Sequence, residues 1–189
     1  MKRYFYLFLT LLTVSFPMAL TSCGDDDDDA NNAGGGGTTP TLKVENQTES
    51  FRYVYWNIDE SNSSGTKKLY QIEFCSFDFA GGVVPDKGSF FYVSFMADGS
   101  NSELPTGSFS DFEVSGGLNF SSRTGEPGVY FEKGKNCGNL VITKENGSYS
   151  VTIEPLYVLS GDEPNLVTTQ TSLKYRGSLP KAPKEFAIQ

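Results

Sequence analysis

Apolar and polar residues alternate with a period of two along most of the chain from residue 41 onward. This alternation is typical of β-strands that bury one face, and clusters of Gly, Asn, Asp and Pro separate the runs as turns do. The expected strands lie at residues 42–44, 51–56, 67–79, 89–97, 109–120, 129–131, 140–145, 149–153 and 167–175. No window shows an apolar period of 3.6 residues, so the pattern predicts an all-β domain of about nine strands.

Local signals add detail to this pattern. Asn146 and Gly147 separate two alternating runs, which predicts a hairpin with a type I′ turn, because that turn needs φ > 0 at both central residues. Pro155 cannot donate to a ladder, so its strand is expected at a sheet edge or bulged there. A change of phase near Cys75 and Ser76 indicates another bulge. Apolar residues on both faces of several strands favour an antiparallel β-sandwich, and a small lipocalin-like β-barrel is the alternative.

The N-terminus carries an export signal. Two basic residues precede an apolar run over residues 4–20, and small residues follow it, as in a secretory signal peptide. The tetrad Leu-Thr-Ser-Cys23 resembles the lipobox of bacterial lipoproteins, which implies cleavage before Cys23 and lipid on its thiol. A soluble secreted protein cleaved nearby is the alternative. The chain is therefore expected to divide into a signal peptide (1–22), a lipidated linker (23–40) and a β-sandwich domain (41–189).

An acidic segment follows Cys23. Residues 25–29 are five aspartates, which repel one another and cannot pack in a core, and residues 34–37 are four glycines of a flexible linker. The acidic run resembles the export signal of surface lipoproteins in Bacteroidetes-type bacteria. That resemblance implies lipid anchoring in the outer membrane with the domain exposed at the cell surface. A plain solubilising spacer, with the protein facing the periplasm, is the alternative.

The order of motifs in the domain resembles a family of small Bacteroidetes-type surface lipoproteins. The resemblance is carried by Leu-Pro-x-Gly-x-Phe, by Gly-x-Leu-x-Ile with its Asn-Gly hairpin, and by Tyr-x-Gly-x-Leu, at residues 104–109, 138–153 and 175–179. These motifs are turns and strands, and that family has no settled biochemical role. The resemblance therefore implies a location and an all-β domain, and no catalytic residues.

Composition and charge exclude several classes of function. Without Lys2 and Arg3 of the signal peptide, 13 of the 15 basic side chains and all 23 acidic ones remain, a net charge of −10. Nucleic-acid binding needs a basic surface, so nucleic acid is not an expected partner. Histidine is absent, which excludes Ser-His and Cys-His nucleophile pairs and metal sites that need imidazole. We expect no cofactor and no metal, and the polar loop at residues 98–103 is expected to be a turn instead of a calcium site.

Cys75 and Cys137 remain as an even pair once Cys23 carries lipid. An exported protein can keep a disulfide, so these two thiols are candidates for one. Sequence alone does not show whether their Cα atoms come close enough. The alternative is two free thiols, with Cys75 packed as a small apolar side chain and Cys137 in a loop.

Aromatic residues offer the clearest candidates for ligand binding. They make up 14% of the chain, and exposed rings can stack on the apolar faces of sugars. The candidate ligand-binding aromatics are Tyr53, Tyr55, Trp56, Tyr92 and Tyr130. The alternative for each of them is core packing or a cross-strand pair, which strands favour in any case.

A glycan hydrolase is the strongest enzyme alternative without histidine, because two carboxylates suffice for it. The candidate carboxylates on the expected strands are Glu73, Asp78, Glu113, Glu132 and Glu154. No spacing pairs them, so each is expected to be a solvent-facing strand residue.

The sequence therefore predicts a lipid-anchored, non-catalytic binding or interaction module at the cell surface. Its partners are expected to be the membrane, through lipid on Cys23, and a glycan or a surface protein. A fimbrial or adhesin-type structural subunit is the main alternative, and its donor strand would lie at residues 167–175.

Overall fold

A computed structural model describes residues 38–64, 66–78, 85–100, 102–121 and 128–182. The signal peptide, Cys23, the acidic run and most of the linker lie outside these residues, so the expectations for them stay predictions. The prediction of an all-β domain is confirmed, since every regular element in the described part is a strand. Nothing helical in this part has the length and hydrophobicity that a membrane span requires.

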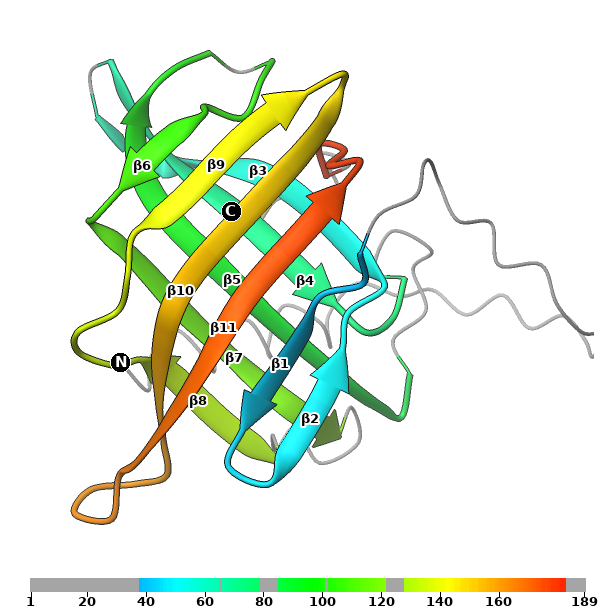
Figure 1. Cartoon of the computed structure of the whole chain (residues 1–189), viewed down its shortest axis with the longest axis vertical. Coiled ribbons are helices and arrows are strands. Elements are labelled where there is room, and N and C mark those ends of the chain that lie inside the picture. Colours follow the sequence, from blue (N-terminus) through cyan, green and yellow to red (C-terminus); the bar gives the residue numbers. More distant parts are fainter. Residues whose placement is uncertain (1–37, 65, 79–84, 101, 122–127, 183–189) are drawn as a thin grey trace, which may run out of the picture. The chain divides into compact units, whose positions relative to one another are not determined.

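The described residues contain eleven strands in two antiparallel sheets (Figure 1). The hairpin of β1 (Thr41–Val44) and β2 (Gln47–Ser50) forms the smaller sheet. The larger sheet contains β3 (Tyr53–Ser64), β4 (Lys67–Cys75), β5 (Lys87–Asp98), β6 (Gly107–Phe109), β7 (Phe112–Ser121), β8 (Val129–Lys133), β9 (Leu140–Glu145), β10 (Ser148–Ser160) and β11 (Val167–Gly177). Its strand order is β3-β4-β5-β7-β8-β10-β9-β6, and β11 also pairs with β10.

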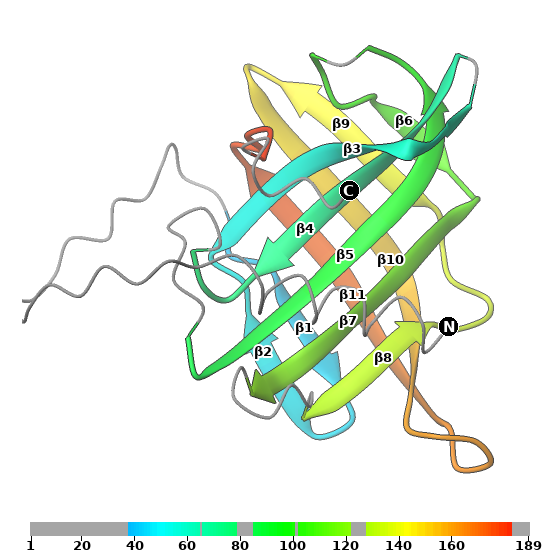
Figure 2. The same ribbon diagram turned by 180° about the vertical axis from the view of Figure 1, so that it is seen from behind.

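The larger sheet folds over on itself, so that two layers face each other. Strands β3, β4, β5, β7 and β8 form the layer in front in Figure 2, and β9, β10 and β11 form the layer in front in Figure 1. The sheet is not closed into a barrel, because no ladder of the described residues joins β3 to β11. The architecture is therefore the antiparallel β-sandwich that the sequence predicts, and the barrel alternative is wrong.

Short segments lie along two edge strands of the larger sheet, β3 and β11, whereas β6 ends the same sheet beyond β9. On β3, the backbone N–H of Trp56 donates to the Pro180 carbonyl at 3.0 Å, and the Trp56 carbonyl accepts from Ala182 N at 2.8 Å. At β11, the side-chain hydroxyls of Thr171 and Thr169 accept hydrogen bonds from the backbone N–H groups of Lys43 in β1 and of Glu45 just after it. The strand considered as a donor strand, β11, thus lies between β10 and β1.

The core lies between the two layers and is rich in aromatic side chains. Phe91 on β5 stacks on Phe74 of β4 with ring centres 4.4 Å apart, and its ring meets Phe51 edge-on at 4.8 Å. Val151 and Leu173 come from the opposite layer and are fully buried in the same core. The alternation in the sequence produces this arrangement, because every second residue of a strand points between the layers.

Two local predictions are confirmed and one is wrong. Asn146 and Gly147 have φ values of 49° and 81° and join β9 to β10 in the predicted hairpin. The pairing of β10 with β11 shifts register around Pro155, which is the expected bulge. The bulge expected near Cys75 is wrong, because β4 pairs with β5 in unbroken register up to Cys75, where the strand ends.

Cys75 and Cys137 are both free thiols, so the candidate disulfide is wrong and its alternative is correct. Cys75 ends β4 and lies opposite Tyr53 and Phe90 in the two neighbouring ladders. Cys137 lies in the connection from β8 to β9, where its Sγ accepts a hydrogen bond from the Tyr157 backbone N–H at 3.3 Å. One thiol therefore belongs to the layer of β4 and the other lies against β10 in the opposite layer.

Candidate functional site

Most of the candidate residues lie on the surface of the layer β3-β4-β5-β7-β8 that faces away from the core, here called the outer face. The register of the ladders determines its neighbours, because directly opposite residues project to the same face. From β3 to β8, one cross-strand row contains Tyr53, Cys75, Phe90, Gly117 and Tyr130. In the same direction, the second row contains Tyr55, Glu73, Tyr92, Ser115 and Glu132. We call these two rows the tyrosine rows.

The residues between the tyrosine rows point the opposite way, into the core. They are Val54, Phe74, Phe91, Gly116 and Phe131, all of them buried. Trp56 lies on this inner side too, and it is only 3% exposed. Its ring packs near Tyr70, with ring centres 6.2 Å apart, so the prediction that Trp56 binds ligand is wrong. Its place directly after Tyr55 is the signal in the sequence, since consecutive strand residues face opposite sides.

The other four candidate aromatics share the outer face. Tyr53 and Tyr55 come from β3, Tyr92 from β5 and Tyr130 from β8. Tyr130 is 38% exposed, and the other three are half-buried. The structure thus brings together four tyrosines that are up to 77 positions apart in the chain. Their role in binding stays a prediction.

Hydrogen bonds hold two of the phenol groups in place. The Tyr55 hydroxyl donates to Asp78 Oδ1 at 3.1 Å, and the hydroxyl oxygens of Tyr130 and Ser115 lie 3.0 Å apart. Burial, followed by the charge of Asp78, raises the pKa of the Tyr55 phenol, and burial likewise raises the pKa of Tyr92. The hydroxyls of Tyr55 and Tyr92 therefore stay protonated at neutral pH and can both donate and accept hydrogen bonds.

Glu73 lies in the middle of the second row, between Tyr55 and Tyr92. Its Oε1 accepts a hydrogen bond from Asn57 Nδ2 at 2.5 Å. Burial raises the pKa of Glu73 from 4.5 to about 7, and the hydrogen bond from Asn57 opposes part of this rise. Near neutral pH the carboxyl group therefore occurs in both forms, as a pure acceptor when charged and as a donor when neutral.

Phe77 and Phe120 extend the cluster of aromatic rings beyond Phe90 of the first row, and the sequence pattern did not show this. Phe120 packs against Phe90 and Phe77, with ring centres 5.3 Å and 5.8 Å away. Strict alternation along β7 would place Phe120 in the core. The register between β5 and β7 shifts next to Gly88, and Asn119 has φ of 54°, so this bulge turns Phe120 to the outer face.

The carboxylates considered for hydrolysis do not flank a common cleft. Glu73 and Glu132 are three strand spacings apart, or about 14 Å, whereas glycosidase carboxyls lie roughly 5–10 Å apart. Glu113 and Glu132 are diagonal neighbours on β7 and β8, roughly 7 Å apart, but both stand on one flat face instead of on two sides of a bond. Asp78 accepts its bond from tyrosine, and Glu154 forms an ion pair of 2.7 Å in the opposite layer. This geometry does not support the hydrolase alternative.

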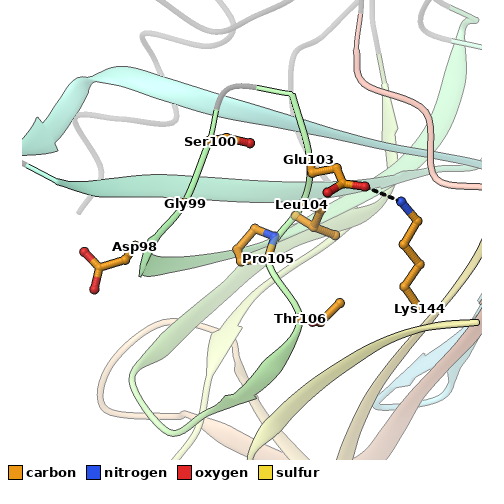
Figure 3. Close-up of a pocket in the computed structure, with 8 residues that line it drawn as sticks. All are labelled: Asp98, Gly99, Ser100, Glu103, Leu104, Pro105, Thr106 and Lys144. Atoms are coloured by element: carbon orange, nitrogen blue, oxygen red, sulfur yellow. Dashed lines mark hydrogen bonds and ion pairs between the residues drawn. The ribbon is translucent and has the colours of Figure 1, made fainter.

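A shallow depression of about 380 Å³ lies between the loop that follows β5 and the strand β9 (Figure 3). Its lining includes an ion pair, in which Lys144 Nζ donates a hydrogen bond to Glu103 Oε1 at 2.6 Å. Asp98, at the other end of the loop, accepts a hydrogen bond from the Thr66 hydroxyl at 3.0 Å. Within the described residues no group of three acidic or cysteine side chains lies close enough together to hold a metal ion.

The outer face is the candidate functional site of the protein. It combines six aromatic side chains, and the ring of Phe120 that is only 5% exposed, with carboxylates, on a surface where a β-sandwich usually carries mainly polar residues. A comparison with known proteins finds no family model, no curated protein and no solved structure that matches the chain. The function of the outer face is therefore inferred from its own residues.

Proposed function

We propose that the protein is a non-catalytic module that binds carbohydrate on its outer face, while lipid on Cys23 anchors it at the surface of the outer membrane. The observation that supports carbohydrate binding most is the joint position of Tyr53, Tyr55, Tyr92 and Tyr130 in two adjacent rows on one face. Tyrosines divided between core and surface would give no such support.

A tyrosine on this face offers two kinds of contact to a sugar. The ring can stack on the apolar C–H face of a pyranose, and the hydroxyl can exchange hydrogen bonds with sugar hydroxyls. Between the rings, Glu73, Ser115 and Glu132 supply further polar partners in the second row. Half-buried side chains lose less rotamer freedom on binding than fully exposed ones, which favours association. The outer face therefore suits a ligand that combines hydroxyl groups with apolar patches.

The length of the tyrosine rows suits an extended glycan. The rows run across the strands, and Tyr53 on β3 and Tyr130 on β8 are four strand spacings apart, or about 19 Å. A surface of this length can contact several consecutive sugar rings. Single small ligands usually bind in concave pockets that enclose most of their surface. A row of rings that runs across the strands instead fits the side of a glycan chain.

Replacing Tyr55 and Tyr92 together with alanine is expected to weaken glycan binding about 30-fold, because each lost ring contact contributes roughly 1 kcal/mol. The measurement is a calorimetric titration of the full chain, purified in detergent, with the glycan that binds best on an array of neutral and acidic glycans. The matched control is Tyr157→Ala, which removes a half-buried tyrosine from β10 in the opposite layer and should leave the affinity unchanged.

Three results would count against carbohydrate binding by the tyrosine rows. The wild-type chain could bind no glycan on the array, or the double variant could retain full affinity. Release of reducing sugar by the wild type would indicate the hydrolase alternative instead. Detergent-resistant polymers of the protein would indicate the fimbrial alternative.

Cys23→Ser is expected to release the protein from the membrane fraction and to abolish labelling with palmitate. The physical reason is that each buried CH₂ of an acyl chain contributes about 0.8 kcal/mol to membrane binding, and this variant has no thiol to carry the chains. Cys137→Ser, which changes a thiol of the folded domain, is the control and should keep both the label and the membrane association. A Cys23→Ser protein that still fractionates with membranes would refute the anchoring proposal.

A further inference from the structure

We infer that the outer face selects uncharged glycans and rejects acidic ones that carry uronate or sulfate groups, and that Glu73 and Glu132 determine this selection. The inference rests on the proposed carbohydrate binding at the tyrosine rows, and it adds the chemical class of the ligand. It follows from the sign and the position of the charges among the rings.

All charged side chains in these rows are carboxylates. Glu73 and Glu132 belong to the second tyrosine row, and Glu113 lies in the next row, opposite Ser94. Apart from Glu113, the described members of this third row are uncharged; they are Asn57, Gln71 and Ser94. Within the described residues of the three rows there is no lysine or arginine to bind an anionic group.

Two neighbouring lysines, Lys133 and Lys67, do not neutralise the negative charge of these carboxylates. Lys133 follows Glu132 on β8 but points to the other side of the sheet, where its Nζ lies 3.8 Å above the ring centre of Phe112 and donates to the Phe112 carbonyl. Lys67 begins β4 opposite Asp98, six residues from Glu73 and thus about 20 Å away along the strand. Among the described members of these rows, an anion would therefore meet carboxylates with no lysine or arginine beside them.

The carboxylates lie where a stacked sugar would bind. Glu73 is one strand spacing from Tyr92, or about 5 Å, and Glu132 is two spacings from Tyr92, or about 10 Å. A uronate or sulfate on a sugar above Tyr92 would be repelled by both, and partial burial strengthens that repulsion because it lowers the effective dielectric constant. Neutral sugar hydroxyls instead donate hydrogen bonds to the same oxygens.

The test compares one neutral glycan with its charged derivative. The neutral chain that binds best on the array is oxidised at its primary hydroxyl groups to uronate, which adds charge and keeps the backbone. The full chain in detergent is expected to bind the oxidised glycan about tenfold more weakly at low salt. This difference should shrink at 1 M salt, where the Debye length falls to about 3 Å.

Two variants assign the selection to residues. Glu73→Gln and Glu132→Gln are each expected to lower the ratio of neutral to oxidised affinity about threefold. Glu154→Gln removes one negative charge from the opposite layer and should leave that ratio unchanged. An unchanged ratio in both outer-face variants would overturn the assignment to these residues.

The same glycan measurements distinguish a failure of charge selection from a failure of carbohydrate binding. Strongest array signals from acidic glycans, or equal affinity for the neutral and the oxidised chain, would overturn the selection and leave carbohydrate binding intact. An array without any bound glycan would overturn both.

Discussion

Replacing Phe91 with alanine is expected to lower the free energy of unfolding by about 4 kcal/mol. The Phe91 side chain is only 1% exposed, stacks on Phe74, and meets the rings of Phe51 and Phe131 at 4.8 Å and 6.4 Å. Each aromatic pair contributes roughly 1 kcal/mol beyond the burial of its area. The deletion would also leave a cavity, because neighbours on two adjacent strands are held by their own ladders and cannot close in on it.

The measurement is the midpoint of denaturant unfolding, which should fall while the slope stays constant. Met96→Ala is the control, because Met96 lies on the same strand but is 37% exposed, and it is expected to lose less than about 1 kcal/mol. A typical domain has a total stability of about 5–15 kcal/mol, so the effect of Phe91→Ala is large enough to detect. A loss as small as that of Met96→Ala would contradict a core between the two layers.

Glu73→Gln is expected to stabilise the protein above pH 7 by up to about 3 kcal/mol. Burial raises the pKa of Glu73 from 4.5 to about 7 in the folded state. One pKa unit corresponds to about 1.4 kcal/mol, so this rise corresponds to about 3 kcal/mol of unfavourable free energy for the charged form. Glutamine has a similar shape and keeps an oxygen that can accept from Asn57, but it carries no charge.

The expected pH dependence follows from proton binding. Between pH 4.5 and 7 the folded state binds more protons at Glu73 than the unfolded chain does, so stability falls as the pH rises through this range. Below pH 4.5 both states are protonated and the loss is absent, and above pH 7 the loss is complete. In Glu73→Gln this decline should disappear.

Denaturant unfolding at pH 5, 6 and 8 would measure this effect. Asn57→Ala is a second variant, because it removes the hydrogen bond that opposes the rise in pKa and should move the decline to higher pH. Equal pH dependence in the wild type and in Glu73→Gln would show that the carboxyl is solvated in the folded protein.

Features that depend on near neighbours could be read from the sequence. Alternation identified most strands, and Asn146 and Gly147 identified the hairpin because only a few residues accept the backbone angles of its turn. The polar run at residues 59–66 shows the limit of such reading. It suggests a turn, but β3 extends to Ser64, which pairs with Lys67 after a register shift that begins at Asp59. Asp59 accepts hydrogen bonds from its polar neighbours within this irregular stretch.

The order of residues alone determined the all-β class, the kinds of catalytic and metal site that a chain without histidine cannot form, and five candidate aromatic residues. Strand pairing across the fold then placed Tyr53 and Tyr130 on one surface, turned Phe120 toward them, and put Cys75 and Cys137 in different layers. The reason is physical. Register and layer depend on contacts between segments far apart in the chain, and a shift of one residue exchanges the two faces of a strand, which no local pattern records.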